Sequence, residues 1–199
     1  MDFLNQTYFA LRGPAEQTQN PHDTVTRLAD RLAQSTQLED RRAALFALRG
    51  LSRDYRAEVG ASALDALLLV IDGDALVDQE VAKAVLQTLT TLCEVDGAES
   101  TAEQREVSLR NTDKVLQDPT HTRKLFGLLN DASFYTRYGT LQLLNTLVTN
   151  RRSVVQSHFL NAPENSQTVT ATLEEKRDII RTGEFFVSTY LSRKLIRIE

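Results

Sequence analysis

The side chains that most often carry chemistry are few and scattered in this 199-residue chain. His22, His121 and His158 stand far apart and have no partner at the spacing of a metal site. Isolated histidines of this kind are more often surface or capping residues. Cys93 falls among leucines at helical spacing, which favours a small core residue over a nucleophile. We therefore predict no catalytic residue, no cofactor site and no metal site, and a protein that is not an enzyme.

The segment DGDALVDQE, residues 72–80, superficially resembles a calcium-binding loop. Leu76 and Val77, however, occupy places where an EF-hand needs an oxygen ligand and the turn glycine. The chain also has no glycine-rich loop that could hold a phosphate. These two ligand classes are therefore not predicted.

The stretch EDRRAALFALRGLSRDYRAEVG, residues 39–60, is the most basic-looking segment of the chain. Asp40, Asp54 and Glu58 lie within three or four residues of its arginines, where ion pairs across a helical turn form easily. The stretch predicts an amphipathic helix with a charged outer face, followed by Tyr55 and a Glu58–Gly60 junction that leads into the next helix. The five arginines are not expected to share one line on the helix: Arg41, Arg42, Arg49, Arg53 and Arg56.

Charge and composition narrow the classes of partner. The chain has 23 basic and 27 acidic residues and a net charge of −4, so a general affinity for nucleic acid or anionic lipid is not expected. A single cysteine is typical of a reducing compartment such as the cytosol. The N-terminus does not resemble a secretory signal, and the longest nearly apolar run, 61–71, is too short to cross a bilayer. Any membrane association is therefore expected to be peripheral.

Apolar residues recur at intervals of three and four between breaks marked by glycine and proline, which predicts an all-α chain. The first helix is expected to start at Asp23-Thr24. Breaks are predicted at Gly13-Pro14, Asn20-Pro21, Asp72-Gly73-Asp74, Asp96-Gly97, Asp118-Pro119 and Ala162-Pro163. The expected buried helix faces are Leu28, Leu32 and Ala33; Ala44, Ala47, Leu48 and Leu51; and Leu64, Leu67, Leu68 and Ile71.

One pattern recurs from Arg41, Ala82 and Arg137, with small or apolar residues at offsets +3, +6, +7 and +10. The starts are 41 and 55 residues apart, so the second interval contains an insertion, which we place near 94–118. That segment has seven acidic and three basic residues and predicts a solvated loop with a polar helix. The period indicates an armadillo/HEAT-like helical-repeat solenoid of about three repeats, an α-α superhelix. The arginine at a repeat start is expected to pair with an acid or a carbonyl of the neighbouring repeat.

With the repeats placed, residues 25–92 resemble the start of the globular head of the general vesicular transport factor family, long vesicle-tethering proteins of the endoplasmic-reticulum-to-Golgi step. The most specific pieces are LADRLAQSTQLEDRRAAL and LRGLSRDYRAEVG. A weaker similarity continues through LFGLLNDASFYTRYGTLQLLNTLVTNR to about Arg181, so that it covers about 155 of the 199 residues. The resemblance implies an armadillo-like head that helps dock vesicles before fusion through protein contacts.

The resemblance also implies partners and a place in the cell. Members of the family work with a Rab-type GTPase, SNAREs and golgins, peripherally on Golgi and transport-vesicle membranes, and carry a longer head, a dimerising coiled coil and an acidic tail. This chain lacks the sustained heptads of a coiled coil and looks like the opening quarter of such a head, a truncated solenoid. Whether it forms a homodimer is left open.

Three regions follow from the resemblance: an N-terminal extension at 1–21, the head fragment at 22–182 and a divergent tail at 183–199. The tail, GEFFVSTYLSRKLIRIE, has no helical periodicity and does not resemble the family. Our hypothesis is that the reading frame leaves the family sequence near Thr182 or Gly183.

Two further functions stay open beside a tethering module. One is a generic cytosolic helical-repeat adaptor or scaffold. The other is an α-helical hydrolase, which would require activity that depends on His121, His158 or Cys93.

Overall fold

The computed structural model describes residues 20–76, 78–95 and 100–162, and all regular structure in those ranges is helical. The predicted all-α fold class is confirmed. The elements are α2 (Pro21–Gln34), α3 (Leu38–Leu51), α4 (Arg56–Asp72), the 3-10 turn η1 (Asp74–Leu76), α5 (Gln79–Cys93), α6 (Ala102–Val115), α7 (Pro119–Leu128) and α8 (Phe134–Leu160). α8 is kinked at Arg151, whose φ and ψ of −139° and 59° are not helical.

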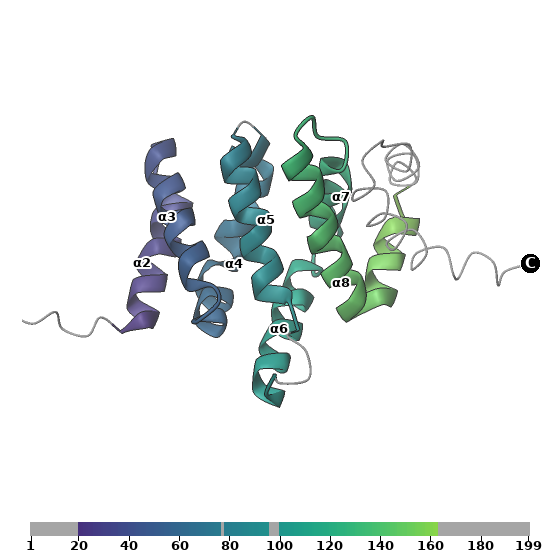
Figure 1. The fold of residues 1–199 in the computed structure, drawn as a ribbon, viewed down its shortest axis with the longest axis horizontal. Coiled ribbons are helices and arrows are strands. Elements are labelled where there is room, and N and C mark those ends of the chain that lie inside the picture. Colours follow the sequence, from purple (N-terminus) through teal and green to yellow (C-terminus); the bar gives the residue numbers. More distant parts are fainter. Residues whose placement is uncertain (1–19, 77, 96–99, 163–199) are drawn as a thin grey trace, which may run out of the picture.

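The helices stack in two rows (Figure 1). α3, α5 and α8 form the front row, in which α5 contacts both of its neighbours. α2, α4 and α7 form the row behind, and each contacts the front-row helix beside it in sequence. The three matched sequence segments that start at Arg41, Ala82 and Arg137 are thus the three front-row helices. This arrangement confirms the predicted helical-repeat solenoid.

The matched offsets explain how the front row packs. At offsets +3 and +7 the side chains of all three helices are buried: Ala44, Leu48, Val85, Leu89, Thr140 and Leu144. At offset +6, Thr88 and Leu143 are buried, but Ala47 is exposed. Offset +6 lies one turn after offset +2, where Gly139 of α8 packs against Leu86 of α5, so this side of the helix faces the preceding helix of the row. The prediction that Ala47 is buried was therefore wrong because α3 is the first front-row helix among the described residues.

Several helix ends differ from the predicted ones. Asn20 caps α2, through a bond from the His22 backbone N–H to its side-chain oxygen, so the start predicted at Asp23-Thr24 was three residues late. The buried face of α2 is Val25, Ala29 and Leu32, and the predicted Ala33 is exposed. The Glu58–Gly60 segment lies inside α4 and is no junction. The Asp118-Pro119 break is confirmed, with Asp118 as N-cap and Pro119 in the first turn of α7.

Ion pairs in the 39–60 stretch connect different helices, contrary to the prediction of pairs across one helical turn. Asp40 pairs with Arg31 of α2. Arg41 forms a two-pronged pair with Asp74, at 2.6 Å from Nε to Oδ2 and 2.8 Å from Nη2 to Oδ1. Arg42 reaches Asp78, the N-cap of α5, at 3.2 Å. Asp74 and Asp78 of the calcium-like segment therefore hold α3 against η1 and the start of α5.

The arginines at the repeat starts share one backbone contact. Nη1 of Arg41 donates to the carbonyl of Ser35 at 2.8 Å, and Nη1 of Arg137 donates to the carbonyl of Asp131 at 2.7 Å. Each acceptor lies six residues upstream, in the turn before the arginine's own helix. The predicted pairing with the neighbouring repeat is confirmed for Arg41 through Asp74. Each of the two carbonyl contacts, in contrast, lies within the arginine's own helix pair.

The predicted insertion contains α6, which Figure 1 shows projecting below the rows. Thr101 and Gln104 form a capping box at its start. Its buried face is largely polar, and the side-chain amide of Asn111 donates to the carbonyl of Leu92 at 3.0 Å. Gly60 of α4 lets this amide approach, because a Cβ at Gly60 would lie 2.2 Å from Oδ1 of Asn111. The predicted polar helix is confirmed.

Some predictions fall outside the described residues. These are the breaks at Gly13-Pro14 and Asp96-Gly97, nearly all of the N-terminal extension at 1–21, the end of the head fragment after residue 162, and the tail at 183–199.

Replacement of Gly60 tests the packing between α4 and α6. We expect Gly60→Ala to lower the free energy of unfolding by about 2 kcal/mol, because the methyl group must displace Asn111 from its buried hydrogen bond. Denaturant unfolding followed by circular dichroism measures the change.

Gly50→Ala is the matched control, since no atom lies within 4 Å of a Cβ at Gly50 in α3. It should stabilise the chain by up to about 1 kcal/mol through helix propensity. Equal effects of the two substitutions would contradict the described contact.

Candidate interaction surface

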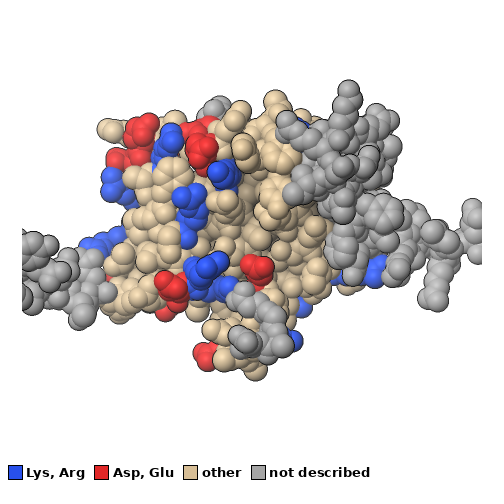
Figure 2. Space-filling view, in the orientation of Figure 1, with Lys and Arg blue, Asp and Glu red and all other residues tan. Residues whose placement is uncertain are grey.

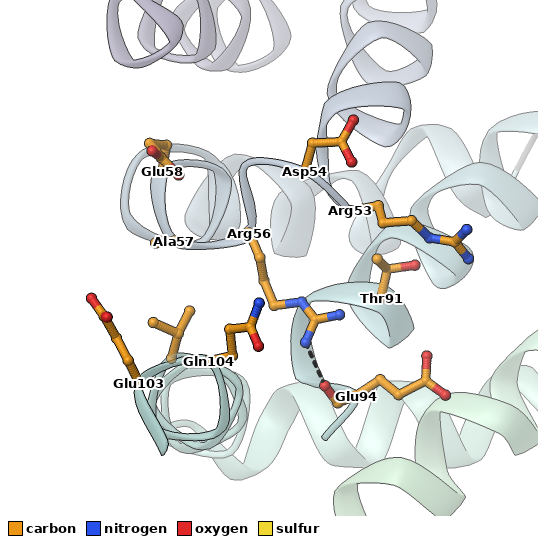
Figure 3. Close-up of a pocket in the computed structure, with 10 residues that line it drawn as sticks. Arg53, Asp54, Arg56, Ala57, Glu58, Thr91, Glu94, Glu103 and Gln104 are labelled. Atoms are coloured by element: carbon orange, nitrogen blue, oxygen red, sulfur yellow. Dashed lines mark hydrogen bonds between the residues drawn. The ribbon is translucent and has the colours of Figure 1, made fainter. Parts of the chain in front are cut away.

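A cavity of about 520 Å³ opens between the start of α4, the end of α5 and α6. In Figure 3 the Arg56 side chain points between these helices toward Glu94, and Glu103 and Gln104 of α6 lie on the opposite side. The lining carries acidic and basic groups together: Arg53, Asp54, Arg56, Ala57, Glu58, Thr91, Glu94, Glu103, Gln104 and Val107. Neither a histidine nor a cysteine lines this cavity.

Arg56 ties three helices together at this cavity. Its Nη1 donates to the backbone carbonyl of Glu94 at 2.8 Å and to Oγ of Ser108 at 2.9 Å. The Ser108 hydroxyl donates to the same carbonyl at 2.8 Å. The guanidinium thus caps the carboxyl end of α5, where helix carbonyls lack partners within the helix. Its position indicates a structural junction, and we assign the cavity no reaction.

The three histidines make local contacts in the structure. His22 is exposed in the first turn of α2, with Nδ1 3.2 Å from the Thr26 hydroxyl. Nδ1 of His121 lies 3.3 Å from the carbonyl of Val115. His158 packs against α7, with Nδ1 3.0 Å from the hydroxyl of the buried Thr122, and burial lowers the pKa of its imidazole. His121 thus contacts the end of α6 and His158 contacts α7, and neither of these contacts involves a cysteine.

Cys93 lies at the end of α5 with no exposed surface, which confirms its predicted place in the core. Burial raises the pKa of its thiol to about 12, so the thiolate needed for nucleophilic attack does not form near neutral pH. Its backbone carbonyl accepts a hydrogen bond from the Asn150 amide at 2.7 Å, which joins α5 to α8.

The described residues offer neither a metal site nor a membrane span. No three His, Cys, Asp or Glu side chains in the described ranges are placed to share a metal ion. No described helix combines the length and the apolar character needed to cross a membrane.

The exposed side of the front row carries a feature that the sequence analysis missed. Arg42, Phe46 and Arg49 lie on one line of α3, and both guanidinium groups stand over the Phe46 ring, at 5.4 and 5.1 Å from its centroid. Lys83 of α5 stands 5.2 Å from the centroid of the exposed Tyr135 ring of α8. Figure 2 shows lysine and arginine side chains over α3 and α5 on this face. The spacing of four and three residues between Arg42, Phe46 and Arg49, which places them on one side of a helix, could have revealed this feature in the sequence.

Stacked helix pairs of this kind define an armadillo/HEAT-like helical-repeat protein, a class that binds other molecules along its rows. No protein-family model matches the chain. Among curated proteins, the general vesicular transport factor p115 of Bos taurus is 30% identical over 176 residues, which cover 86% of this chain and 18% of the relative. Golgin candidate 6 of Arabidopsis thaliana is 27% identical over 92% of this chain and 20% of its own length.

Comparison with solved structures indicates the same family. A crystal structure of Uso1, Uso1-2, superposes with a TM-score of 0.79 at 25% identity and covers 89% of this chain and 30% of that one. The chain is therefore homologous, over most of its length, to the p115/Uso1 general vesicular transport factors, and it matches part of their helical head. It spans about a fifth of the length of the curated relatives it matches. None of the relatives' names denotes an enzyme.

The burial of Cys93 predicts an unreactive thiol. A chromogenic disulfide reagent at pH 8 should not label the folded chain within an hour, because the pKa of the thiol lies far above that pH. The same reagent should label one thiol per chain in guanidinium chloride, which serves as the positive control. Rapid labelling of the folded chain would contradict the described position of Cys93.

Proposed function

We propose that this chain is a head-domain fragment of a vesicle-tethering protein that acts in transport from the endoplasmic reticulum to the Golgi and in docking before fusion. The observation that carries the proposal is the homology to p115 and Uso1 over most of the chain, together with the likeness to the Uso1 head. The yeast relatives are named intracellular transport proteins and the animal relatives vesicular transport factors.

Protein contacts along the stacked rows are the proposed mode of action. The front row presents three helices side by side over a buried apolar core, which suits binding of an extended or helical partner segment. The proposed partners are a Rab-type GTPase, SNAREs and golgins, and the proposed location is the cytoplasmic surface of Golgi and transport-vesicle membranes.

The division of the chain belongs to the same proposal. Residues 22–182 form the head fragment, 1–21 an extension and 183–199 a divergent tail, with the acidic insertion near 94–118. Catalysis is not part of the proposed function. This part of the proposal is supported by the contacts of His121 with the Val115 carbonyl and of His158 with the Thr122 hydroxyl, and by the buried thiol of Cys93.

A transport assay in permeabilised cells tests the function. An excess of the purified 199-residue chain should slow the arrival of a secretory cargo at the Golgi, because the fragment competes with the full-length tether for its partners. Cargo glycan processing measures the arrival. Immobilised chain should also retain a Rab-type GTPase, a SNARE or a golgin from the same cytosol.

The control is a Leu89→Asp chain, in which a charge replaces a leucine with no exposed surface at the centre of α5. It should not inhibit transport. If the unmodified chain has no effect on transport and retains only nuclear-transport factors or kinases, the tethering function is wrong and a generic adaptor is favoured.

A further inference from the structure

A second cavity, of about 480 Å³, opens on the front row between α3, α5 and α8. Its lining contains two arginines, and every other lining residue is uncharged: Arg49, Gly50, Ser52, Arg53, Gln87, Thr90, Thr91 and Gln142. It lies beside the larger cavity, with which it shares Arg53 and Thr91. Unlike that cavity, it has no carboxylate in its wall.

The two arginines of this cavity differ from the arginines at the start of the same helix. Arg41 and Arg42 are neutralised by Asp74 and Asp78. In the described ranges, Arg49 and Arg53 form no salt bridge with a carboxylate, and the one contact of the Arg49 guanidinium with another side-chain oxygen is to Oε1 of Gln87 at 3.4 Å. The wall of this cavity therefore carries two guanidinium charges that no salt bridge among the described residues neutralises.

Neighbouring side chains hold this charge in place. The Phe46 ring lies 5.1 Å from the Arg49 guanidinium, which restricts the long side chain before any ligand arrives. Two hydroxyls of the wall already donate to backbone carbonyls, Ser52 to Arg49 and Thr90 to Leu86, both at 2.8 Å. The guanidinium N–H groups are consequently the strongest donors left for a ligand.

We infer that this cavity binds a carboxylate side chain of an acidic segment in a partner protein. Guanidinium groups pair with carboxylates through two parallel hydrogen bonds, and opposite charges favour encounter between protein surfaces. The exposed amides of Gln87 and Gln142 lie in the same wall, where they can bond the backbone of the segment.

The acidic residues of the adjoining cavity favour an occupant with one negative charge over an occupant with two. Asp54 and Glu94 line it next to the shared Arg53, so a doubly charged phosphate would meet repulsion there that a single carboxylate largely avoids. The two arginines are exposed, but they line a hollow between three helices, and this shape suits a protruding side chain better than a flat lipid surface. The inference rests on the proposed docking function only in taking the occupant to be a protein segment.

Fluorescence anisotropy with synthetic peptides tests the inference on the full 199-residue chain. The probe is a fluorescein-labelled peptide of four consecutive glutamates with glycine and serine flanks, measured at low salt. It should bind, and Arg49→Gln with Arg53→Gln should weaken binding by at least ~10-fold. A peptide with glutamines in place of the glutamates should bind at least ~10-fold more weakly to the unmodified chain.

The matched control is Arg105→Gln with Arg110→Gln, which removes the same charge from exposed positions on α6. It should keep the dissociation constant within about twofold, since exposed charges distant from a site contribute little. Circular dichroism shows whether both double variants remain folded.

Four results would overturn the inference: no binding of the acidic peptide, an equal loss in both double variants, tighter binding of a phosphoserine peptide, or phosphatidylserine vesicles as the only ligand that depends on Arg49 and Arg53. The transport assay separates this inference from the proposed function. If the chain binds no acidic peptide but still inhibits transport, the inference about the cavity is wrong and the proposed tethering function is unaffected.

Discussion

The burial of α5 on nearly all sides is the constraint on which the rest of the structure depends. Nine of its 15 residues are buried, against three of 14 in α3. The buried residues of α5 lie all around the helix. They are therefore shielded from water only when α3, α4, α6 and α8 are all packed against it. The close contact of Gly139 in α8 with Leu86, where a Cβ would lie 3.4 Å from the leucine, shows how tightly one of these neighbours fits. A single repeat could not supply this burial.

Polar contacts between the helix pairs fix the register of the stack. Arg41 pairs with Asp74 of η1 and Arg42 with Asp78 at the start of α5. Asn150 joins α8 to the end of α5, and Arg151 pairs with Asp113 of α6 at 2.6 Å. Partly exposed ion pairs of this kind contribute little free energy, but their directions allow only one alignment of neighbouring helices. The same alignment brings Arg49, Gln87 and Gln142 from three helices into one cavity wall, so the stacking order creates the surface that we propose for docking.

The sequence predicted the helices and their stacking well, because apolar spacing and repeat offsets are properties of the local chain. It failed where burial depends on neighbours. Ala47 matches Thr88 and Leu143 in offset, yet it is exposed because its helix starts the described front row. Ion pairs of the 39–60 stretch were expected across one helical turn, although Arg42 pairs with Asp78 of the next helix pair and Asp40 with Arg31 of the preceding helix. The front-row cavity unites residues nearly a hundred positions apart, and a charge count over 39–60 alone could not reveal it.

Hydrogen exchange measured by mass spectrometry on the folded 199-residue chain tests the central role of α5 most directly. If the stack depends on this helix, its amides should exchange more slowly than those of α2 and α3 by on the order of 100-fold, because they open only when the whole stack unfolds. Amides of α5 that exchange as fast as those of α2 would show that the helix opens by itself and would contradict the account.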